Sequence, residues 1–442
     1  MISLRSRWFL VTVVATLVVP IWLIARPQLA PIVPAAAKEG PGSASTSLYL
    51  LEQHSSRSLK ALDPETLADM SGSAGITLGK WSIGNPAPRL LVSADGSTLA
   101  AITPGRNGEF TLGPRDITIR LIDLATGMQR AKFHPPVAMQ IDSIGISQNG
   151  RQVFGHQDGY DGRSLGWYVL NTSNGRVVHK IAFTGECCGP SLYDAATQHL
   201  FVMDTGYGDQ TGPVTPSLTE YDVKAHRKVG AVKLEGVLAG VWPTDRMIHG
   251  NPVMRMWNPG LALSPDGHTI AVVAANSNLL SLIDTTNLQA VQTKKIASSE
   301  GLLERLTGWL GLAPSAASAK ELEGMDLHLA FSADGRSLYV TGTQGTVESD
   351  GSFSWHGLGL RVVDVGSGRI TAETLQGEQT VWVQGASAGA TLYTLSLRSP
   401  SLEGPSCPCD LRRHDPSTLK SMAERTFSSY PELLLRARAA QH

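Results

Sequence analysis

The sequence has little charge. Charged residues make up only 17% of its 442 residues, the formal net charge is -1, and no block of five or more like charges occurs. This balance lacks the basic excess that is typical of nucleic-acid-binding domains, so we expect no nucleic-acid partner. The P-loop, His-Glu-x-x-His and Cys-x-x-Cys-His patterns are also absent. Their absence argues against the sites that these patterns mark, covalent haem among them, and we expect no cofactor.

Long hydrophobic runs are absent with one exception, at the N-terminus. Residues 8–25 carry no charge and follow Arg5 and Arg7. A helix of this length spans roughly 27 Å, about the thickness of the hydrocarbon layer. The preceding positive charges favour an N-terminus inside and the remainder outside. We expect a single-pass anchor in the cytoplasmic membrane within residues 1–37, followed by a flexible tether at 38–47. A cleaved signal peptide, which would leave a secreted chain, is the alternative.

Cysteine is scarce and occurs in two close pairs, Cys187 with Cys188 and Cys407 with Cys409. An even number of cysteines in an exported chain favours disulfides, either within each pair or between the pairs. A thiolate metal site and a redox-active pair are the alternatives. The sequence does not give the connectivity.

Glycine and proline, in contrast, are frequent, with 45 and 25 residues. This suits many short strands joined by tight turns. Alternating apolar segments end in an Asp or Asn that starts a turn, and this pattern recurs at intervals of roughly 50 to 80 residues. The turn-starting residues are Asp63, Asp123, Asn171, Asp222, Asp284, Asp364 and Asp415. Four strands per repeat, arranged radially, predict a β-propeller over residues 48–442.

Three repeats also share a turn between their first and second strands. It reads Ser-Ala-Asp-Gly at 93–96, Ser-Pro-Asp-Gly at 264–267 and Ser-Ala-Asp-Gly at 332–335. With the apolar strands that follow, these residues resemble the YVTN-type and WD-repeat-like propeller families. The resemblance implies a fold and says almost nothing about function. We therefore predict an all-β, seven-bladed β-propeller with an N-terminal transmembrane helix and a short amphipathic helix at 300–312, between units five and six.

The C-terminal segment has a predicted structural role. The first unit lacks its own first strand, and 431–438 (PELLLRAR) is similar to 88–93 (PRLLVS). We expect this segment to enter the first unit as its innermost strand and to close the ring, which removes exposed edges. The alternative is a short C-terminal helix.

The longer connections are expected on one rim, opposite the tight turns, because strands alternate in direction. They are 104–116, 156–164, 205–217, 235–258, 297–323, 343–357 and 398–406. Loops of this length are usually functional. The candidate binding residues there are Trp242, Trp257, Trp355, Tyr160, Tyr207, His156, His249 and His356. The aromatic residues form a recognition patch or pack the loops onto the ring. The histidines are expected to be scattered loop residues, with a metal or acid–base site as the alternative.

Two further groups have a structural interpretation. His328 lies among apolar neighbours and is expected in the core or the channel. Asp158 and Asp161 resemble a calcium loop but lack its full set of oxygens, so a solvated turn is expected and we predict no metal site.

We predict a recognition module that binds a protein or a small-molecule ligand on its long-loop face. The alternative is an exported enzyme or electron-transfer subunit, since some propellers of the resembled group belong to amine-oxidising enzymes and others are lactonases or lyases. No residue set of this sequence carries those activities over.

Overall fold

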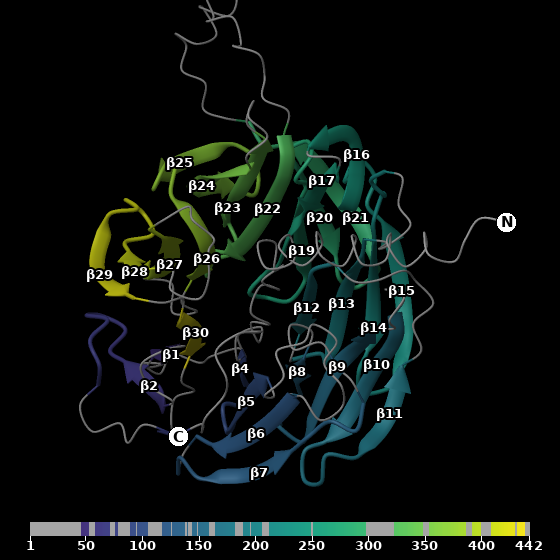
Figure 1. Cartoon of the computed structure of the whole chain (residues 1–442), viewed down its shortest axis with the longest axis vertical. Helices are drawn as coiled ribbons and strands as arrows, with labels where there is room; N and C mark the ends of the chain where they lie inside the picture. Colours follow the sequence, from purple (N-terminus) through teal and green to yellow (C-terminus); the bar gives the residue numbers. More distant parts are fainter. Residues whose placement is uncertain are drawn as a thin grey trace, which may run out of the picture.

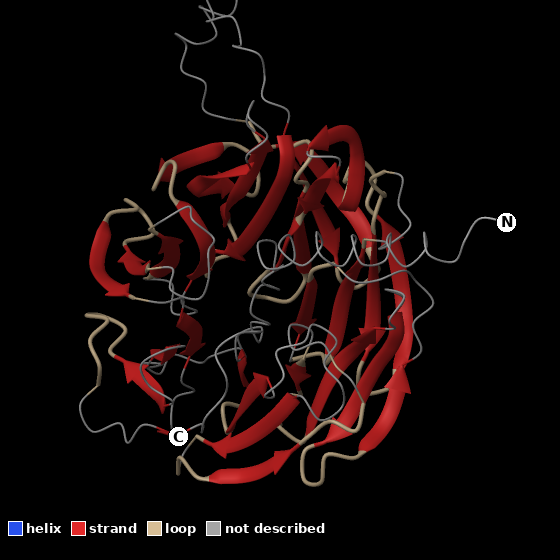
Figure 2. Ribbon diagram, viewed as in Figure 1, coloured by secondary structure: helices blue, strands red, loops and turns tan. Residues whose placement is uncertain are grey.

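The structure is a computed structural model that describes the chain between Thr46 and Ala437. The internal residues that it does not describe are 53–57, 71–75, 78–88, 94, 105–116, 125, 138, 140–143, 148, 159–163, 182–188, 195, 206–211, 249–250, 298–321, 348–352, 386–390, 399–407 and 429–430. Every element of the described part is a strand, and the sheets stand around a common axis (Figures 1 and 2). The chain is therefore an all-β propeller, as its repeats predicted.

Six sheets have four antiparallel strands, and we call these sheets blades. Five of them use strands that are consecutive in the chain. These are β4 (Arg89–Val92), β5 (Thr98–Pro104), β6 (Ile117–Asp123) and β7 (Gln129–Phe133); β8 (Gly145–Ile146), β9 (Gln152–Asp158), β10 (Ser164–Asn171) and β11 (Val177–Ile181); β12 (Ser191–Asp194), β13 (His199–Asp204), β14 (Ser217–Asp222) and β15 (Arg227–Lys233); β18 (Gly260–Leu263), β19 (Thr269–Val273), β20 (Leu279–Asp284) and β21 (Gln289–Lys295); and β26 (Gln379–Gly385), β27 (Leu392–Leu397), β28 (Cys409–His414) and β29 (Ser421–Phe427).

The sixth blade joins the two ends of the described chain. It consists of β1 (Thr46–Glu52), β2 (Ser58–Leu62), β3 (Ile76–Thr77) and the C-terminal β30 (Pro431–Ala437). β30 pairs antiparallel with β1 from Thr46↔Ala437 to Glu52↔Pro431. The predicted ring closure is confirmed, and the alternative of a C-terminal helix is wrong. β1 begins inside the predicted tether at 38–47, so the last residues of that segment belong to the propeller.

The remaining sheet departs from this pattern because it has six strands. β22 (Leu322–Phe331), β23 (Ser337–Val347), β24 (Phe353–Asp364) and β25 (Ile370–Thr374) form an antiparallel meander. A hairpin of β16 (Gly240–Ile248) and β17 (Asn251–Asn258) extends it. The prediction of a seven-bladed propeller is therefore wrong: six sheets are four-stranded blades, and the remaining sheet takes up the hairpin β16–β17 and has six strands. We call it the six-stranded sheet.

Neither helix of the predicted fold class is found in the described part, where every element is a strand. The segments 8–25 and 300–312, on which those predictions rest, lie outside the described residues. Between Thr46 and Ala437, the described segments contain no helix that is long and apolar enough to cross a membrane.

The repeated Asp or Asn marks the turn between the third and fourth strands. In the turn at Asp415, the Leu419 N–H donates to the backbone carbonyl of Asp415 (2.8 Å), and the Ser417 N–H donates to its Oδ1 (2.9 Å). Hydrogen bonds from Ser417 and Thr418 lower the pKa of Asp415 to about 2. Such side-chain bonds to a nearby backbone are the reason why Asp and Asn favour turns.

The fifth residue of these turns has a positive φ. It is glycine in three turns, at Gly127, Gly175 and Gly368, and leucine in three others, at Leu67, Leu288 and Leu419. A left-handed conformation costs a leucine roughly 1 to 2 kcal/mol. All three leucines are buried in core clusters, which contributes about 1.5 to 3 kcal/mol for each. Packing between sheets therefore offsets the backbone strain.

The Ser-x-Asp-Gly turns are held by one repeated set of hydrogen bonds. Ser264 Oγ donates to Asp266 Oδ1 (2.6 Å) and accepts from the Thr269 N–H (2.9 Å). The glycine has φ of 76°, and a Cβ added there would lie 3.4 Å from Asp194 of the preceding blade. The glycine of the motif is therefore required by its positive φ, since a Cβ at 3.4 Å would make only an ordinary contact with the neighbouring sheet.

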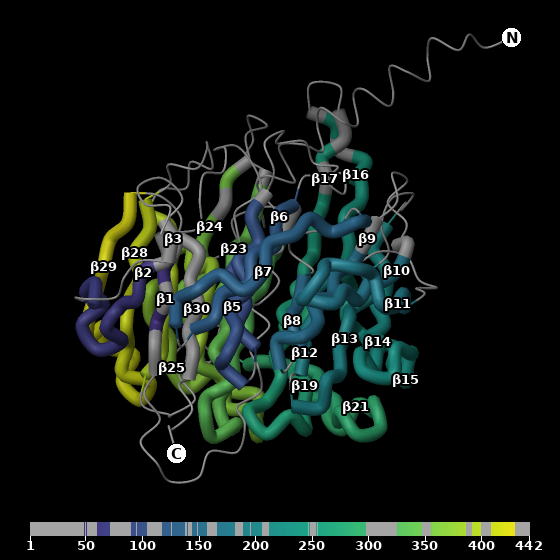
Figure 3. The backbone as a smooth tube through the Cα atoms, turned by 90° about the horizontal axis from the view of Figure 1, so that it is seen from below, coloured from purple at the N-terminus to yellow at the C-terminus, as the bar shows by residue number. Residues whose placement is uncertain are grey.

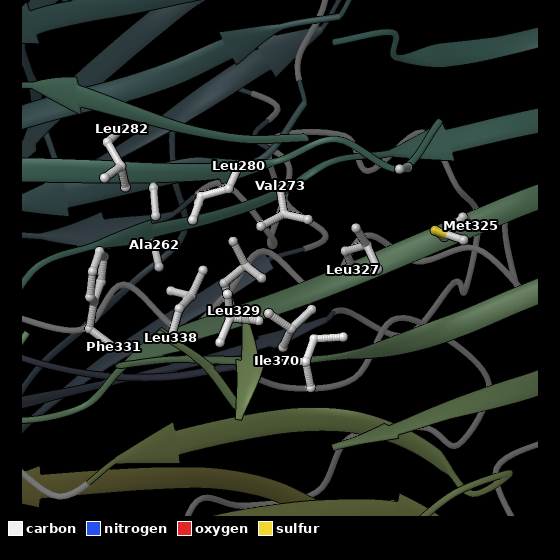
Figure 4. Close-up of a cluster of buried hydrophobic side chains, with 14 residues drawn as sticks. Ala262, Val273, Leu280, Leu282, Met325, Leu327, Leu329, Phe331, Leu338 and Ile370 are labelled. Carbon is white, nitrogen blue, oxygen red and sulfur yellow. The ribbon is translucent and has the colours of Figure 1, made fainter. Parts of the chain in front are cut away.

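The core lies between neighbouring sheets. One apolar cluster joins the blade β18–β21 to the six-stranded sheet, and Figure 4 shows side chains of both meeting there. From β22, Met325, Leu327, Leu329 and Phe331 all point toward this cluster. Because side chains alternate along a strand, the residues between them face the opposite side, toward the next blade.

Candidate functional site

The regular ring is interrupted on one side by the six-stranded sheet. Figure 3 shows β16 and β17 rising above the other strands on the rim opposite the tight turns. β17 lies parallel to β22 from Met256↔Gly324 to Asn258↔Asp326. β23 and β24 are also long, at 11 and 12 residues. Much of the predicted loops 235–258 and 343–357 is therefore strand, and these strands build a raised platform on the long-loop rim.

Gly342 allows β23 to lie close against β22 below this platform. Its φ is 155°, and a Cβ added there would lie 2.1 Å from the backbone oxygen of Asp326 on β22. Any other residue would push the two strands apart at this level. The register shift between Thr341 and Thr343 lies at the same point.

Two of the predicted aromatic residues meet on the hairpin. Trp242 and Trp257 pack edge to face, with their ring centroids 5.2 Å apart. Trp242 is only 5% exposed, and Trp257 packs against the apolar cluster of Met325 and Leu327. For this pair, the structure favours the interpretation in which aromatic residues fix the rim segments to the ring.

The opposite face of β22 carries buried polar groups. Asp326 and His328 are two residues apart and so share this face. Their side chains are 14% and 8% exposed, and Asp326 Oδ2 lies 3.6 Å from His328 Nε2. Burial raises the pKa of Asp326, while His328 and a hydrogen bond from the Asn258 side chain oppose that shift. A carboxyl group is thus held in a poorly solvated position at the innermost strand of the meander.

Thr341 completes this polar group. It is the direct cross-strand partner of His328, and residues so placed have their side chains on the same face of a sheet. Thr341 is fully buried, and its Oγ1 has no hydrogen-bond partner in the described structure. We call Asn258, Asp326, His328 and Thr341 the inner polar cluster.

The other predicted site residues lie in different surroundings. His156 is not on a loop: it belongs to β9, is fully buried, and packs on the Trp167 ring at 5.6 Å. His356 is exposed on β24, where its Nε2 lies 3.2 Å from Ser354 Oγ. Trp355, its neighbour in β24, is the cross-strand partner of Gly345. The strand β9 ends at Asp158, the first residue of the supposed calcium loop. Tyr160, Asp161, Tyr207 and His249 lie outside the described residues.

The cysteine prediction stays a prediction. Cys409 is the first residue of β28 and is fully buried beside Leu411 and Phe427. Cys187, Cys188 and Cys407 lie outside the described residues. Among the residues that the structure describes, no group of three or more His, Cys, Asp or Glu side chains could hold a metal ion.

Two Gly-x-Ser-x-Gly sequences, at 162–166 and 385–389, receive no support as a hydrolase motif. Ser164 opens β10 and pairs with Asp158 in an antiparallel ladder. The motif requires a sharp strand-to-helix turn. Ser387 lies outside the described residues.

The sequence drew attention to His328 but missed Asp326, Asn258 and Thr341. A signal for Asp326 exists in the segment Met325–Phe331. There, Asp326 and His328 alternate with large apolar residues in a first strand that begins earlier than those of the other repeats. No local sequence pattern indicates that Asn258 belongs to this cluster. Asn258 reaches Asp326 because β17 pairs with β22, and the blade β18–β21 separates these two strands in the sequence.

His414 is buried as well, after His156 and His328, and it lies in the blade that follows the six-stranded sheet. The residue before the repeated Asp or Asn is apolar or tyrosine elsewhere, at Leu62, Ile122, Leu170, Tyr221, Ile283 and Val363. His414 Nε2 lies 2.8 Å from Thr394 Oγ1, and its Nδ1 lies 3.1 Å from the Leu419 carbonyl. This arrangement fits a neutral ring that donates from Nδ1 and accepts at Nε2.

We expect His414 to make the chain less stable at acidic pH. Burial lowers its pKa below the usual 6.5, and nearby Arg412 acts in the same direction. The unfolded chain therefore binds the proton first, and stability falls as the pH drops below about 6.5. Urea unfolding at pH 7.5 and pH 5.5 checks this. The double variant His414→Leu, Thr394→Val should lose clearly less stability between the two values than the wild type. An equal loss in both proteins would contradict the expectation.

No family model matches this chain, and no curated protein does. The YVTN-type or WD-repeat-like family is thus not confirmed, whereas the propeller fold is. Among solved structures, Kuenenia stuttgartiensis hydrazine synthase is similar, with 14% identity and a TM-score of 0.44. The match covers 78% of this chain and 80% of that chain. At this level of likeness, nothing about activity follows from it.

Proposed function

We propose that this chain is a recognition module that binds a protein or a small-molecule ligand on the rim of its six-stranded sheet. The observation that carries the proposal is the departure from regularity at this one sheet. The added hairpin β16–β17 and the lengthened β23 and β24 contribute nothing to the four-stranded pattern of the ring. A rigid scaffold that presents an elaborated segment on one rim is a design for binding.

The side chains on this platform suit a contact surface. Met247 near the tip of the hairpin is 58% exposed, and His356 on β24 is exposed as well. Beneath them, the packing of Trp242 against Trp257 supports the hairpin from below. An exposed flexible methionine on a rigid base is a feature of adaptable binding surfaces.

The proposal includes a location. Residues 1–37 would contain the membrane anchor, with 8–25 in the bilayer, and the propeller would lie outside the cytoplasmic membrane. The charge-free run and the two preceding arginines support this arrangement. The whole chain should then stay with the membrane pellet after an alkaline carbonate wash. Release into the supernatant would contradict anchoring and favour the cleaved, secreted form.

Site-specific photo-crosslinking tests the binding face. A photoreactive amino acid at position 247 or 356 of the full chain should crosslink one common species in cells. The matched control is position 291 on β21, where Val291 is 69% exposed but belongs to the outer strand of a regular blade. Equal crosslinking from position 291, or none from the two rim positions, would overturn the proposal.

One observation favours a second candidate, an exported enzyme or electron-transfer subunit. The inner polar cluster places a carboxyl group of raised pKa near a histidine, which is an arrangement typical of acid–base sites. Visible absorption and metal analysis of the purified full chain separate the two candidates. A stoichiometric metal or chromophore would favour the enzyme class.

A further inference from the structure

The inner polar cluster is short of hydrogen-bond donors. An ionised carboxylate is acceptor-only and offers about four lone-pair sites. Asp326 receives a hydrogen bond from the Asn258 side chain, and His328 Nε2 at 3.6 Å is too distant for a second one. Among the described residues, the cationic partner of Asp326 is His328, which carries a charge only when it is protonated, and no lysine or arginine forms an ion pair with Asp326.

A second, independent observation points to the same place. Thr341 Oγ1 is fully buried without a hydrogen-bond partner in the described structure, and Thr341 faces His328 across the strands. Buried hydroxyl groups in native proteins are nearly always paired, so an orphaned one calls for an explanation. A partner that donates to Asp326 and also contacts Thr341 would satisfy both groups.

We propose that the inner polar cluster binds the positively charged nitrogen of a small ligand, an ammonium group, with Asp326 as its counter-ion. This inference rests on the proposed function, because it gives the chemical class of a ligand that reaches the inner edge of the six-stranded sheet. Asp326 accepts N–H groups of the ligand. Thr341 Oγ1 accepts another, and Asn258 holds the carboxylate in place.

The electrostatics favour a cation over a neutral donor. A buried carboxylate without a full countercharge is costly, and its raised pKa reports that cost. A bound positive charge offsets it, whereas a hydroxyl group or water supplies hydrogen bonds but no charge. The Asp326 side chain as a whole is 14% exposed, so the cluster lies next to the solvent-accessible surface and is not fully enclosed.

Thermal shift and calorimetric titration of the full chain, with n-butylammonium chloride as the probe, test the inference. Uncharged n-butanol is the matched control ligand, and sodium chloride keeps the ionic strength constant. We expect butylammonium to raise the melting temperature and butanol to leave it unchanged. Equal shifts with both probes, or no shift with either, would overturn the inference.

Variants of the cluster residues test whether butylammonium binds at the inner polar cluster. Asp326→Asn should weaken butylammonium binding at least about tenfold, and Thr341→Val about threefold. Asp326→Asn should also raise the melting temperature of the free protein, because it removes a poorly compensated charge. Glu373→Gln, on the outer strand β25 of the same sheet, is the matched carboxylate control and should bind like the wild type. Unchanged binding by Asp326→Asn would contradict the assignment.

The two proposals fail separately. If the rim positions crosslink a partner but butylammonium does not bind, the ligand class is wrong and the binding face stands. If butylammonium binds through Asp326 but the rim positions crosslink nothing, the cluster is a ligand site that does not depend on a partner at the platform.

Discussion

Deletion of residues 431–442 is expected to destabilise the whole propeller, on the order of 5 kcal/mol from lost backbone hydrogen bonds alone. These residues include β30, which pairs with β1 from Thr46↔Ala437 to Glu52↔Pro431. Without β30, the edge of β1 loses its hydrogen-bond partners. Leu48 and Leu50, both fully buried in β1, then lie at an open edge of the ring. Urea or thermal unfolding of the full chain and the deletion variant measures the loss.

The matched control removes only residues 438–442, which follow β30. This shorter deletion should leave the unfolding midpoint unchanged. A synthetic peptide of residues 429–442 should restore part of the stability of the longer deletion, because it can pair again with β1. If the two deletions unfold alike, closure through β30 contributes little to stability.

This closure could be predicted from the sequence because the evidence for it is local. The first repeat lacked a strand, and residues 431–438 resembled the first strand of the second repeat. The turn residues were readable for the same reason: Asp415 and Asp266 bind backbone groups within a few residues. Both features depend on short segments whose structural preference comes from the residues within the segment and not from distant contacts.

The six-stranded sheet could not be predicted in this way. β17 pairs with β22 in parallel although the blade β18–β21 separates them in the chain. Pro243 and Pro252 interrupt the alternation of the hairpin, so the segment reads as a loop. The inner polar cluster depends on this pairing and on the register of His328 with Thr341. Neither has a local signature.

For His156, the sequence predicted a loop where the structure has a strand. The polar segment that follows it predicted a loop, but β9 extends through it to Asp158. The residue packs on Trp167 of the neighbouring strand, and cross-strand packing of this kind outweighs the local polarity.

Asp410→Ala is expected to cost roughly 1.5 to 3 kcal/mol, the range for hydrogen bonds to a charged group, because the Asp410 carboxylate is buried while the side chain of its partner Arg398 is 50% exposed. Asp410 is 3% exposed. It accepts hydrogen bonds from Arg398 Nε at 2.7 and 2.8 Å and from Thr426 Oγ1 at 2.8 Å. These three residues hold together the rim ends of β27, β28 and β29. Alanine would leave the two donors without their common acceptor, and Arg412 without one of its carboxylates.

The pH dependence of this stability difference tests whether the negative charge of Asp410 is its cause. Burial alone would raise the pKa of Asp410, but hydrogen bonds from Arg398 and Thr426 outweigh it, and the net pKa is lowered. The stabilisation is therefore present above the unfolded value of 3.8 and disappears as the pH falls through the folded value. The wild type and Asp410→Ala should differ fully at pH 7 and progressively less below pH 4. Glu424→Gln, whose side chain is 42% exposed, is the control and should cost less than about 1 kcal/mol. A difference that stays constant down to pH 3 would show that packing, and not the ionised carboxylate, stabilises this end of the blade.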